Sequence, residues 1–295
     1  MDLLVIVGPT AIGKTKLSIA IAKEFNGEII SGDSMQFFKG MDIGTAKASK
    51  AERKEVKHHL LDILEPEENF SVVDYQKIVR EKIAQIKAKG KLPILVGGSG
   101  LYIQAIIYDY KFKGKKSEKR EELAKMSLSE LQAKLKEKNP VFYQKIDLNN
   151  KRRVIRALEK DDEDMQTNPK AYYDDYLIIG LNTTRKVLYE RINNRVDEMI
   201  KNGLISEAKS IYDKNITNNS IQAIGYKELF AYFSGEISLD KAIELIKRNS
   251  RRYAKRQLTW FRNKLNVTWF ESNFVDFDST IKAVKKFIKK RSKAS

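Results

Sequence analysis

The sequence predicts an α/β fold, in which a doubly wound parallel sheet carries an inserted helical domain. Short apolar runs alternate along the 295 residues with amphipathic segments of helical spacing, which is the order of elements in such folds. Most of these runs are continuously apolar rather than alternating, as expected for parallel strands covered by helices on both faces. Residues 113–170 break the rhythm because they are rich in Lys and Glu and contain no strand-like run.

Five segments are predicted to form the strands of this sheet, namely Leu3–Val7, Glu28–Ser31, Pro93–Val96, Leu177–Leu181 and Val267–Phe270. Amphipathic helices are predicted between them. They occupy residues 14–25, a stretch from a cap at Ser71 to Gly90, and a stretch from a cap at Thr184 to Gly203.

The chain is predicted to form two domains. Residues 1–112 and 172–295 would form the α/β core with C-terminal helices, and residues 113–171 a helical insertion domain. Within the insertion, helical spacing is visible at Leu123, Leu128, Leu131 and Leu135, and Pro140 and Pro169 interrupt the stretch.

Charge and composition narrow the class of function. Hydrophobic residues make up 42% of the chain, which excludes a disordered polymer, and the lack of cysteine excludes disulfides and Cys-ligated metal sites. No apolar run reaches the ~20 residues of a membrane helix, and a strand is predicted from Leu3, so we expect a soluble, cytoplasmic protein without a signal peptide. The formal charge of +17 favours a nucleic-acid partner, although a generally Lys-rich composition would also produce it.

The octapeptide GPTAIGKT has the spacing of a phosphate-binding P-loop, which predicts a P-loop NTPase-like core. Gly8 and Gly13 allow the backbone to curl so that its N–H groups face an anion, and the following helix adds its positive end. The Lys14 ammonium is expected to reach terminal phosphates, and the Thr15 hydroxyl suits Mg²⁺. The diphosphate- or nucleotide-binding residues are therefore predicted to be Gly8, Pro9, Thr10, Ala11, Ile12, Gly13, Lys14 and Thr15.

A second candidate lies in GEIISGDSMQ, residues 27–36. Its strand is expected beside the first, which would place Asp33 at the carboxyl edge of the sheet, where α/β enzymes bind ligands. A carboxylate there could orient Mg²⁺, bind a substrate hydroxyl or act as a general base. A loop aspartate that caps a turn is the structural alternative.

Two weaker signals concern glycines and histidines. In LVGGSGLY, residues 95–102, a strand ends in glycines and a serine, which suits close approach of a ligand but also a plain tight turn. His58 and His59 are the only histidines, and adjacent side chains point in different directions. A shared metal site is therefore not expected, and a structural role is favoured.

The run KRNSRRYAKRQLTWFR, residues 247–262, is predicted to form a helix with a basic stripe. The stripe consists of Arg248, Arg252, Lys255 and Arg262, while Leu245, Tyr253, Leu258 and Phe261 can face the core. The alternative is that this run forms a charged, solvent-exposed face of the helix without a partner, as such runs usually do. Together with KRRVIR at residues 151–156 and the global charge, it predicts contacts with phosphates of RNA.

The motifs GPTAIGKT, GDSMQ, MDIGTAK, HHLLDI, LVGGSGLY, IGYKE and RRYAKRQLTWFR occur in this order between residues 4 and 272. In this combination the chain resembles the bacterial tRNA dimethylallyltransferases, also called tRNA isopentenyltransferases. The resemblance implies transfer of the dimethylallyl group from dimethylallyl diphosphate to the exocyclic amine of an adenosine. That adenosine lies 3′ of the anticodon in tRNAs that read codons beginning with U. It further implies Mg²⁺ and a P-loop catalytic core with a helical insertion domain that contacts tRNA, the two clasping the anticodon stem-loop. We expect the protein to be a monomer.

The resemblance also implies roles for individual residues. Asp33 would be the base that accepts the amine proton, Thr10 would lie near the bridging oxygen, and Arg185 would reach the diphosphate. The residues that would contact the target base or the surrounding RNA are Asp33, Ser34, Met35, Gln36, Ser99, Arg120, Arg152, Arg153, Val154, Ile155 and Arg156. Arg252 and Lys255 of the basic stripe join them as predicted phosphate contacts.

Two rival functions remain open at this point. In a P-loop nucleoside or metabolite kinase, Asp33 would bind the acceptor hydroxyl, but no arginine-rich lid is evident and the charge excess would have no purpose. A non-enzymatic RNA-binding protein would leave Asp33 and Thr10 without a role. The chain also departs from the family pattern near residues 113–120 and 160–170, where its segments look short.

Overall fold

The computed structural model describes residues 1–110, 118–144, 146–159, 170–216 and 219–292. The chain divides into two compact units, Met1–Tyr108 with Ala171–Ser295, and Asp109–Lys170. The predicted domain boundaries, after residues 112 and 171, lie within four residues of these divisions. The segments that look short against the family pattern lie near residues 113–120 and 160–170, and of these residues 113–117 and 160–169 lie outside the described part of the chain.

The larger unit is built on a parallel sheet. Its strands are β1 (Leu3–Val7), β2 (Gly27–Ser31), β3 (His58–His59), β4 (Leu92–Gly97), β5 (Tyr176–Asn182) and β6 (Thr268–Glu271). Among the described residues, the sheet has six strands in the order β3-β2-β4-β1-β5-β6, and every neighbouring pair is parallel. The predicted fold class is therefore confirmed. The two-residue strand β3 was missed because it is too short to form an apolar run.

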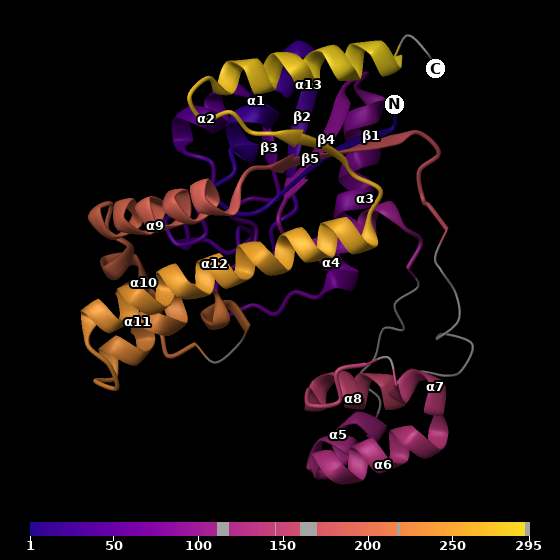
Figure 1. The fold of residues 1–295 in the computed structure, drawn as a ribbon, viewed down its shortest axis with the longest axis vertical. Helices are drawn as coiled ribbons and strands as arrows, with labels where there is room; N and C mark the ends of the chain where they lie inside the picture. The colour runs from indigo at the N-terminus through magenta and orange to yellow at the C-terminus, as the bar shows by residue number, and fades with distance from the viewer. Residues whose placement is uncertain (111–117, 145, 160–169, 217–218, 293–295) are drawn as a thin grey trace. The chain divides into compact units, whose positions relative to one another are not determined.

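Helices cover both faces of this sheet (Figure 1). Those nearest the sheet are α1 (Lys14–Glu24), α3 (Val72–Ala88), α4 (Gly100–Ile107), α9 (Arg185–Lys201) and α13 (Phe277–Ser292), and a short α2 (Lys50–Glu55) precedes β3. The central strand β1 alternates between the two faces. Leu4 and Ile6 pack in one cluster with residues of α1, α9 and α13, and the neighbouring β1 side chains pack in the other with α3 and α4. The loops at the carboxyl edge therefore follow strands that are packed against helices on both faces.

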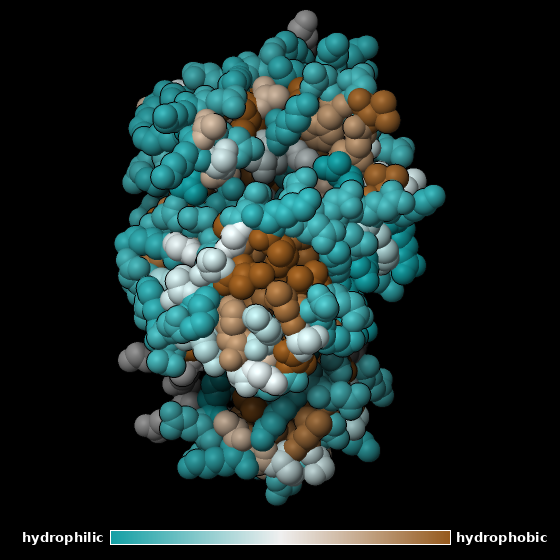
Figure 2. Space-filling model, turned by 90° about the vertical axis from the view of Figure 1, so that its left-hand side faces the viewer, coloured by the Kyte–Doolittle hydropathy of each residue, from teal (hydrophilic) through white to brown (hydrophobic). Residues whose placement is uncertain are grey.

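A third group of helices lies beyond the carboxyl edge of the sheet. It contains α10 (Leu204–Tyr212), α11 (Tyr226–Phe233) and the long α12 (Leu239–Lys264), which pack around a separate apolar cluster. The side of the molecule on which α9, α10 and α11 lie in Figure 1 faces the viewer in Figure 2, and an apolar patch occupies its centre. The apolar cluster also includes Phe38 and Met41 from the loop after β2, so it joins that loop to the helices.

The smaller unit is helical, in line with the spacing of its leucines. It consists of α5 (Glu118–Lys125), α6 (Leu128–Lys138), α7 (Pro140–Tyr143) and α8 (Lys151–Leu158). Leu123, Leu131 and Leu135 are buried in its core together with one face of α8. Across the described residues of both units, no helix combines the length and the apolarity that crossing a membrane requires.

Candidate active site

The predicted P-loop joins β1 to α1, and its backbone has the expected curl. Gly13 has φ +96°, in the left-handed region that glycine adopts at little cost, and precedes the first residue of α1. A Cβ at Gly13 would lie 2.5 Å from the ring of Phe277, so the space for this loop is also limited by the start of α13. Gly8, Pro9, Ala11 and Ile12 complete a loop at the carboxyl edge of the sheet.

The side chain of Lys14 folds back onto the loop that it follows. Its Nζ donates hydrogen bonds to the carbonyl oxygens of Gly8, at 3.0 Å, and Pro9, at 2.7 Å. Burial, assisted by the nearby positive charge of Arg195, lowers the pKa of Lys14 to about 7. A bound anion would favour the charged ammonium. A phosphate group bound in this loop would therefore stabilise Lys14 as a cation and be paired with it.

Gln257 of α12 fixes the P-loop to the turn after β4. Its Oε1 accepts a hydrogen bond from the backbone N–H of Thr10 at 3.0 Å, and its Nε2 donates to the carbonyl oxygen of Gly98 at 3.0 Å. The side chain is buried. One amide thus ties two loops at the carboxyl edge to the helix that carries the basic stripe.

The glycines of LVGGSGLY are explained by packing. A Cβ at Gly97 would lie 2.2 Å from the backbone oxygen of Gly32, and a Cβ at Gly98 would lie 2.1 Å from Nε2 of Gln257. At Gly100 it would meet the ring of Trp260 at 2.3 Å. The close approach that requires these glycines is therefore made by neighbouring protein atoms, and a ligand is not needed to explain them. Gly97 and Gly98 also line the cavity described below.

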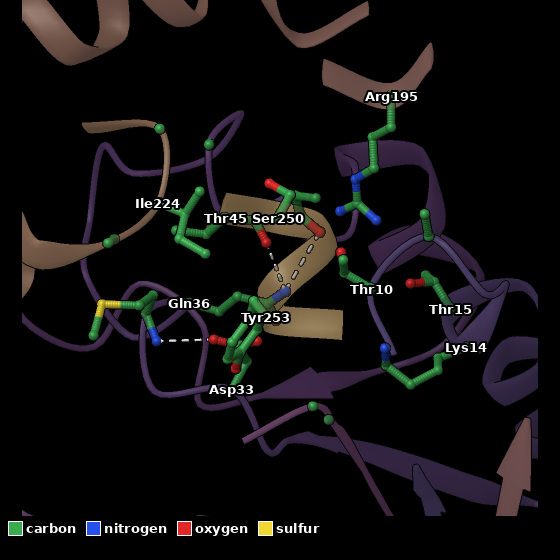
Figure 3. Close-up of a pocket in the computed structure, with 18 of the residues that line it drawn as sticks. Thr10, Lys14, Thr15, Asp33, Gln36, Thr45, Arg195, Ile224, Ser250 and Tyr253 are labelled. Atoms are coloured by element: carbon green, nitrogen blue, oxygen red, sulfur yellow. Dashed lines mark hydrogen bonds between the residues drawn. The ribbon is translucent and has the colours of Figure 1, made fainter. Parts of the chain in front are cut away.

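Asp33 lies just after β2, at the edge that the sequence predicted. Its Oδ1 accepts the backbone N–H of Met35 at 3.0 Å, an interaction visible in Figure 3. Burial raises the pKa of Asp33, whereas that hydrogen bond and the charges of Lys14 and Arg195 oppose the rise. A buried carboxylate with a raised pKa is typical of a proton acceptor in an active site.

Polar side chains surround Asp33. Ser34 and Ser99 are joined, because the N–H of Ser34 donates to the Ser99 Oγ at 3.3 Å and the two hydroxyl oxygens lie 3.4 Å apart. Tyr253 of α12 lines the same cavity, and burial raises its pKa to about 12. The expectation that Tyr253 would face the core is wrong, since its ring lies at the site beside Asp33 (Figure 3).

The amide of Gln36 is occupied by protein atoms. Its Nε2 donates to the carbonyl oxygens of Thr45 and Ala46, at 3.2 and 3.3 Å, and its Oε1 accepts the Ser31 hydroxyl at 2.9 Å. Both donor hydrogens and one acceptor lone pair are therefore used within the chain. This geometry favours a positioning role for Gln36 over direct recognition of a base.

One cavity of about 770 Å³ in the larger unit is lined by residues 10–15 of the P-loop and by Asp33, Ser34, Gln36, Tyr253 and Gln257. Gly8, Pro9 and Ser99 are not among its lining residues. Figure 3 shows Thr10, Lys14, Thr15 and Arg195 on one side of it, and Asp33, Gln36, Tyr253 and Ile224 on the other. The charged residues of its lining are five cations and two carboxylates, namely Lys14, Arg191, Arg195, Lys227, Arg256, Asp33 and Glu198. The side beside Ile224 also has apolar walls, formed by Met35, Leu204 and Ile246. The cavity can hold an anionic group and an apolar group together.

Two of the three arginines that line the cavity, Arg191 and Arg195, come from α9, whereas the resemblance implied Arg185 of the same helix. Arg195 reaches into the cavity beside Thr10 and the P-loop (Figure 3), and Arg191 lines it and donates from Nε to the Ala11 carbonyl at 2.9 Å. Arg185 is exposed, with its guanidinium 5.0 Å from the ring of Tyr189, and is not among the residues that line the cavity. Arg191 and Arg195 are four residues apart and so share a face of α9, whereas Arg185, six and ten residues earlier, lies on another face of the helix.

The oxygen donors of the cavity fit the magnesium ion that the resemblance implies. Mg²⁺ is usually held by one or two protein oxygens together with phosphates of the substrate. The Thr15 hydroxyl lies at the start of α1 on the P-loop side of the cavity (Figure 3). Within the described residues, no cluster of three or more His, Cys, Asp or Glu could hold a metal. The donors therefore suit an ion that arrives with a diphosphate, with Thr15 as its protein ligand.

The histidines have structural partners. His59 Nε2 lies 2.6 Å from Oε2 of Glu28, a buried carboxylate that also pairs with Lys91. The Nδ1 of His58 lies 2.8 Å from the carbonyl oxygen of Val56. These contacts agree with the structural role favoured from the sequence.

The predicted RNA contacts differ in their exposure. Arg252 and Lys255 of α12 are exposed, and so are Arg152, Arg153 and Arg156 of α8. Arg120 Nε lies 3.9 Å from a carboxylate oxygen of Glu159. The two remaining residues of the α8 segment, Val154 and Ile155, are buried in the core of the smaller unit, so their side chains cannot contact RNA in this conformation.

Comparison with known proteins gives consistent matches. The family model described as IPP transferase matches residues 36–264. The tRNA dimethylallyltransferase of Bacillus licheniformis is 53% identical over 91% of this chain and 90% of its own length. That of Bacillus subtilis is 52% identical over the same shares of the two chains.

Solved structures agree with these relatives. The crystal structure of a tRNA isopentenylpyrophosphate transferase from Bacillus halodurans has a TM-score of 0.76 and 48% identity, over 99% of this chain and 98% of that one. A eukaryotic dimethylallyltransferase captured acting on tRNA has a TM-score of 0.84 and 27% identity, over 98% of this chain and 79% of that one. The motifs, the cavity and these matches lead to one conclusion: the chain belongs to the IPP transferase family.

Proposed function

We infer that this protein is a tRNA dimethylallyltransferase, which transfers the dimethylallyl group of dimethylallyl diphosphate to the exocyclic amine of an adenosine in tRNA. The target adenosine is the one 3′-adjacent to the anticodon in tRNAs that read codons beginning with U. The observation that carries this proposal is a single cavity with a P-loop on one side and Asp33 on the other. The family membership supports the same reaction.

The reaction joins the amine nitrogen to the allylic carbon and breaks the bond between that carbon and the diphosphate oxygen. The bonding electrons leave with the diphosphate, and the amine loses one proton. Two tasks therefore fall to the protein, which must stabilise negative charge on the leaving group and accept a proton on the opposite side of the reacting carbon.

The P-loop side is suited to the first task. Its backbone N–H groups, the Lys14 ammonium and the Arg195 guanidinium supply positive charge, and Thr10 lies at the same side of the cavity. Magnesium bound at Thr15 and the diphosphate would add positive charge to the leaving oxygens. We assign to Arg195 the diphosphate contact that the resemblance implied for Arg185, because Arg195 lines the cavity and Arg185 does not.

Asp33 is suited to the second task. As a carboxylate it can accept the amine proton, and its raised pKa makes it a better base than an exposed aspartate. The dimethylallyl group would lie against the apolar walls near Ile224 and Met35. The adenosine must leave its stack to bring its amine to this cavity, as in other enzymes that react with a nucleobase.

The RNA partner is the anticodon stem-loop of tRNA. Exposed basic side chains suit its phosphates, and they occur on α12, at Arg252 and Lys255, and on α8 of the insertion domain, at Arg152, Arg153 and Arg156. The insertion domain is proposed to contact tRNA for this reason. The enzyme would act as a monomer.

The decisive experiment supplies the protein with dimethylallyl diphosphate, labelled in the dimethylallyl group, and with unmodified tRNA and Mg²⁺. The proposal predicts label in the tRNA, at the adenosine beside the anticodon. A kinase would instead move a phosphoryl group from a nucleoside triphosphate, and an RNA-binding protein without activity would leave the tRNA unlabelled. Replacing the target adenosine by guanosine in the same tRNA is the matched control and should abolish incorporation.

A further inference from the structure

The loop of residues 42–46, part of which lines the cavity, is held by the carboxylate of Glu207, which does not line it. Glu207 of α10 accepts the backbone N–H groups of Asp42 and Ile43, each at 2.8 Å to Oε2, and that of Gly44, at 2.9 Å to Oε1. The hydroxyl of Tyr226, the first residue of α11, donates to Oε1 at 2.6 Å. Three successive N–H groups and one hydroxyl thus converge on one side chain.

The packing around this carboxylate requires a glycine in the loop. A Cβ at Gly44 would lie 2.6 Å from Cε2 of Tyr226 and 2.9 Å from its hydroxyl oxygen. The motifs MDIGTAK and IGYKE, of which only Ile224 has a role in the reaction proposed above, therefore meet in space. Gly44 supplies the room that allows the Tyr226 hydroxyl and the loop to share the Glu207 carboxylate.

The same loop reaches the active site through Gln36. Thr45 and Ala46, directly after the clamped residues, accept both hydrogen bonds from the Gln36 amide. Gln36 in turn accepts the Ser31 hydroxyl, and its backbone N–H donates to the Asp33 carbonyl at 3.3 Å. Gly44, Thr45 and Ala46 line the cavity, whereas Glu207 does not. Hydrogen bonds at residues 42–44 and at residues 45 and 46, joined by the backbone of the loop, therefore connect Glu207 to the turn that carries Asp33.

We propose that Glu207 and Tyr226 are positioning residues for the transfer reaction, because they clamp residues 42–44 and, through Gln36, fix the turn that presents Asp33. The inference rests on the proposed function. The charge of Glu207 matters because a carboxylate offers only acceptors, and all four groups that face it are donors. An amide at this position would turn an NH₂ group toward at least one of those donors.

The variant that tests this is Glu207→Gln, which keeps the shape of the side chain. Displacing a reacting group by about 1 Å can cost roughly 10²-fold in rate, so we expect a loss of about 10- to 100-fold in the single-turnover transfer rate at saturating substrates. Affinity for tRNA without dimethylallyl diphosphate should change little, since the exposed basic side chains remain. Asp213→Asn, which removes an exposed carboxylate from the end of the same helix, is the control and should transfer at the wild-type rate.

A double-mutant cycle separates positioning from a general loss of stability. If Glu207 acts through Gln36, the variant carrying both Glu207→Gln and Gln36→Ala should be no slower than the slower single variant. Rates that multiply would overturn the proposal, and so would a Glu207→Gln rate within about threefold of wild type. If Glu207→Gln does not fold, the cycle is measured with Tyr226→Phe, which removes one of the four donors. Rates that multiply with Gln36→Ala, or a Tyr226→Phe rate within about threefold of wild type, would then overturn the proposal. A wild-type protein that labels no tRNA would refute the proposed function itself, whereas an active wild type with unaffected variants would refute only the positioning role.

Discussion

Gln257 Oε1 and the backbone N–H of Thr10, 247 positions apart in the chain, are hydrogen-bonded at 3.0 Å. This contact joins the P-loop to α12, whose exposed face carries Arg252 and Lys255. The helix α12, which is proposed to contact RNA phosphates, therefore also fixes the P-loop, which is proposed to bind the diphosphate. Because Gln257 also donates to the buried carbonyl of Gly98, its loss would leave that carbonyl and the Thr10 N–H without their partner.

The first prediction concerns this amide. Gln257→Ala should lower the efficiency with dimethylallyl diphosphate by about 10- to 100-fold, because the loop that positions the leaving group loses its anchor. Affinity for tRNA alone should stay near the wild-type value. Steady-state kinetics with each substrate varied in turn would measure both effects. Gln76→Ala removes a buried amide that bonds to Ala105, away from the cavity, and serves as the control. Equal losses for the two variants would indicate a general effect on folding.

The second prediction distinguishes two arginines of α9. Arg195→Lys keeps a positive charge but loses the planar fork, and removing one such donor from a developing anion costs about 10²- to 10³-fold in rate. We expect a loss of that order for Arg195→Lys and a change within about threefold for the exposed Arg185→Lys. Single-turnover transfer at saturating substrates would compare them. A larger loss for Arg185→Lys would restore the assignment implied by the sequence.

The third prediction follows from the pKa of Lys14. That pKa is lowered to about 7 in the free protein, so the ammonium is present below this pH and is lost above it. The value of kcat/KM for dimethylallyl diphosphate should therefore fall as pH rises past about 7. The fall in kcat should come at higher pH, since bound diphosphate favours the ammonium. In Lys14→Arg the side chain stays charged, and the fall in kcat/KM should disappear from this range. An identical fall in both proteins would assign it to another group.

The fourth prediction distinguishes a residue proposed to bind tRNA phosphates from one proposed to position the turn that carries Asp33. Arg252→Ala removes one proposed phosphate contact and should reduce the slope of log affinity against log salt by roughly 0.7–0.9, with similar effects on cognate and non-cognate tRNA. Gln36→Ala should leave that slope unchanged and slow transfer, because its amide supports the turn beside Asp33. Salt titrations of tRNA binding for both variants would test this. A reduced slope for Gln36→Ala alone would contradict the division.

Much of the framework was predictable because it depends on local pattern. Mostly continuous apolar runs predicted five of the six strands that the described residues form, and Ser71 and Thr184 begin helices as expected, each with its side chain bonded to a backbone N–H. The P-loop and Asp33 were also identified, since their position follows from the ends of predicted strands. These features need only the order of elements and the edge at which parallel strands end.

The remaining features depend on contacts between distant segments. Gln257 and Tyr253 lie on a helix that reads as basic and amphipathic, and nothing in its periodicity shows that this face meets the P-loop. The half-buried Glu207 contacts need the loop after β2 and two helices that lie more than 150 residues later. Arg195 was missed because it lies on a different face of α9 from Arg185, and the sequence does not show which face of that helix meets the cavity.

The central claim is that Asp33 accepts the proton of the adenosine amine, and Asp33→Asn tests it most directly. Asparagine keeps the shape and can still accept the Met35 N–H, but it cannot take the proton. The measurement is the single-turnover rate of label transfer to saturating tRNA and dimethylallyl diphosphate, with tRNA and diphosphate affinities determined alongside. We predict a rate about 10²- to 10⁴-fold below wild type with both affinities nearly unchanged. A rate within about threefold of wild type would show that Asp33 is not the base.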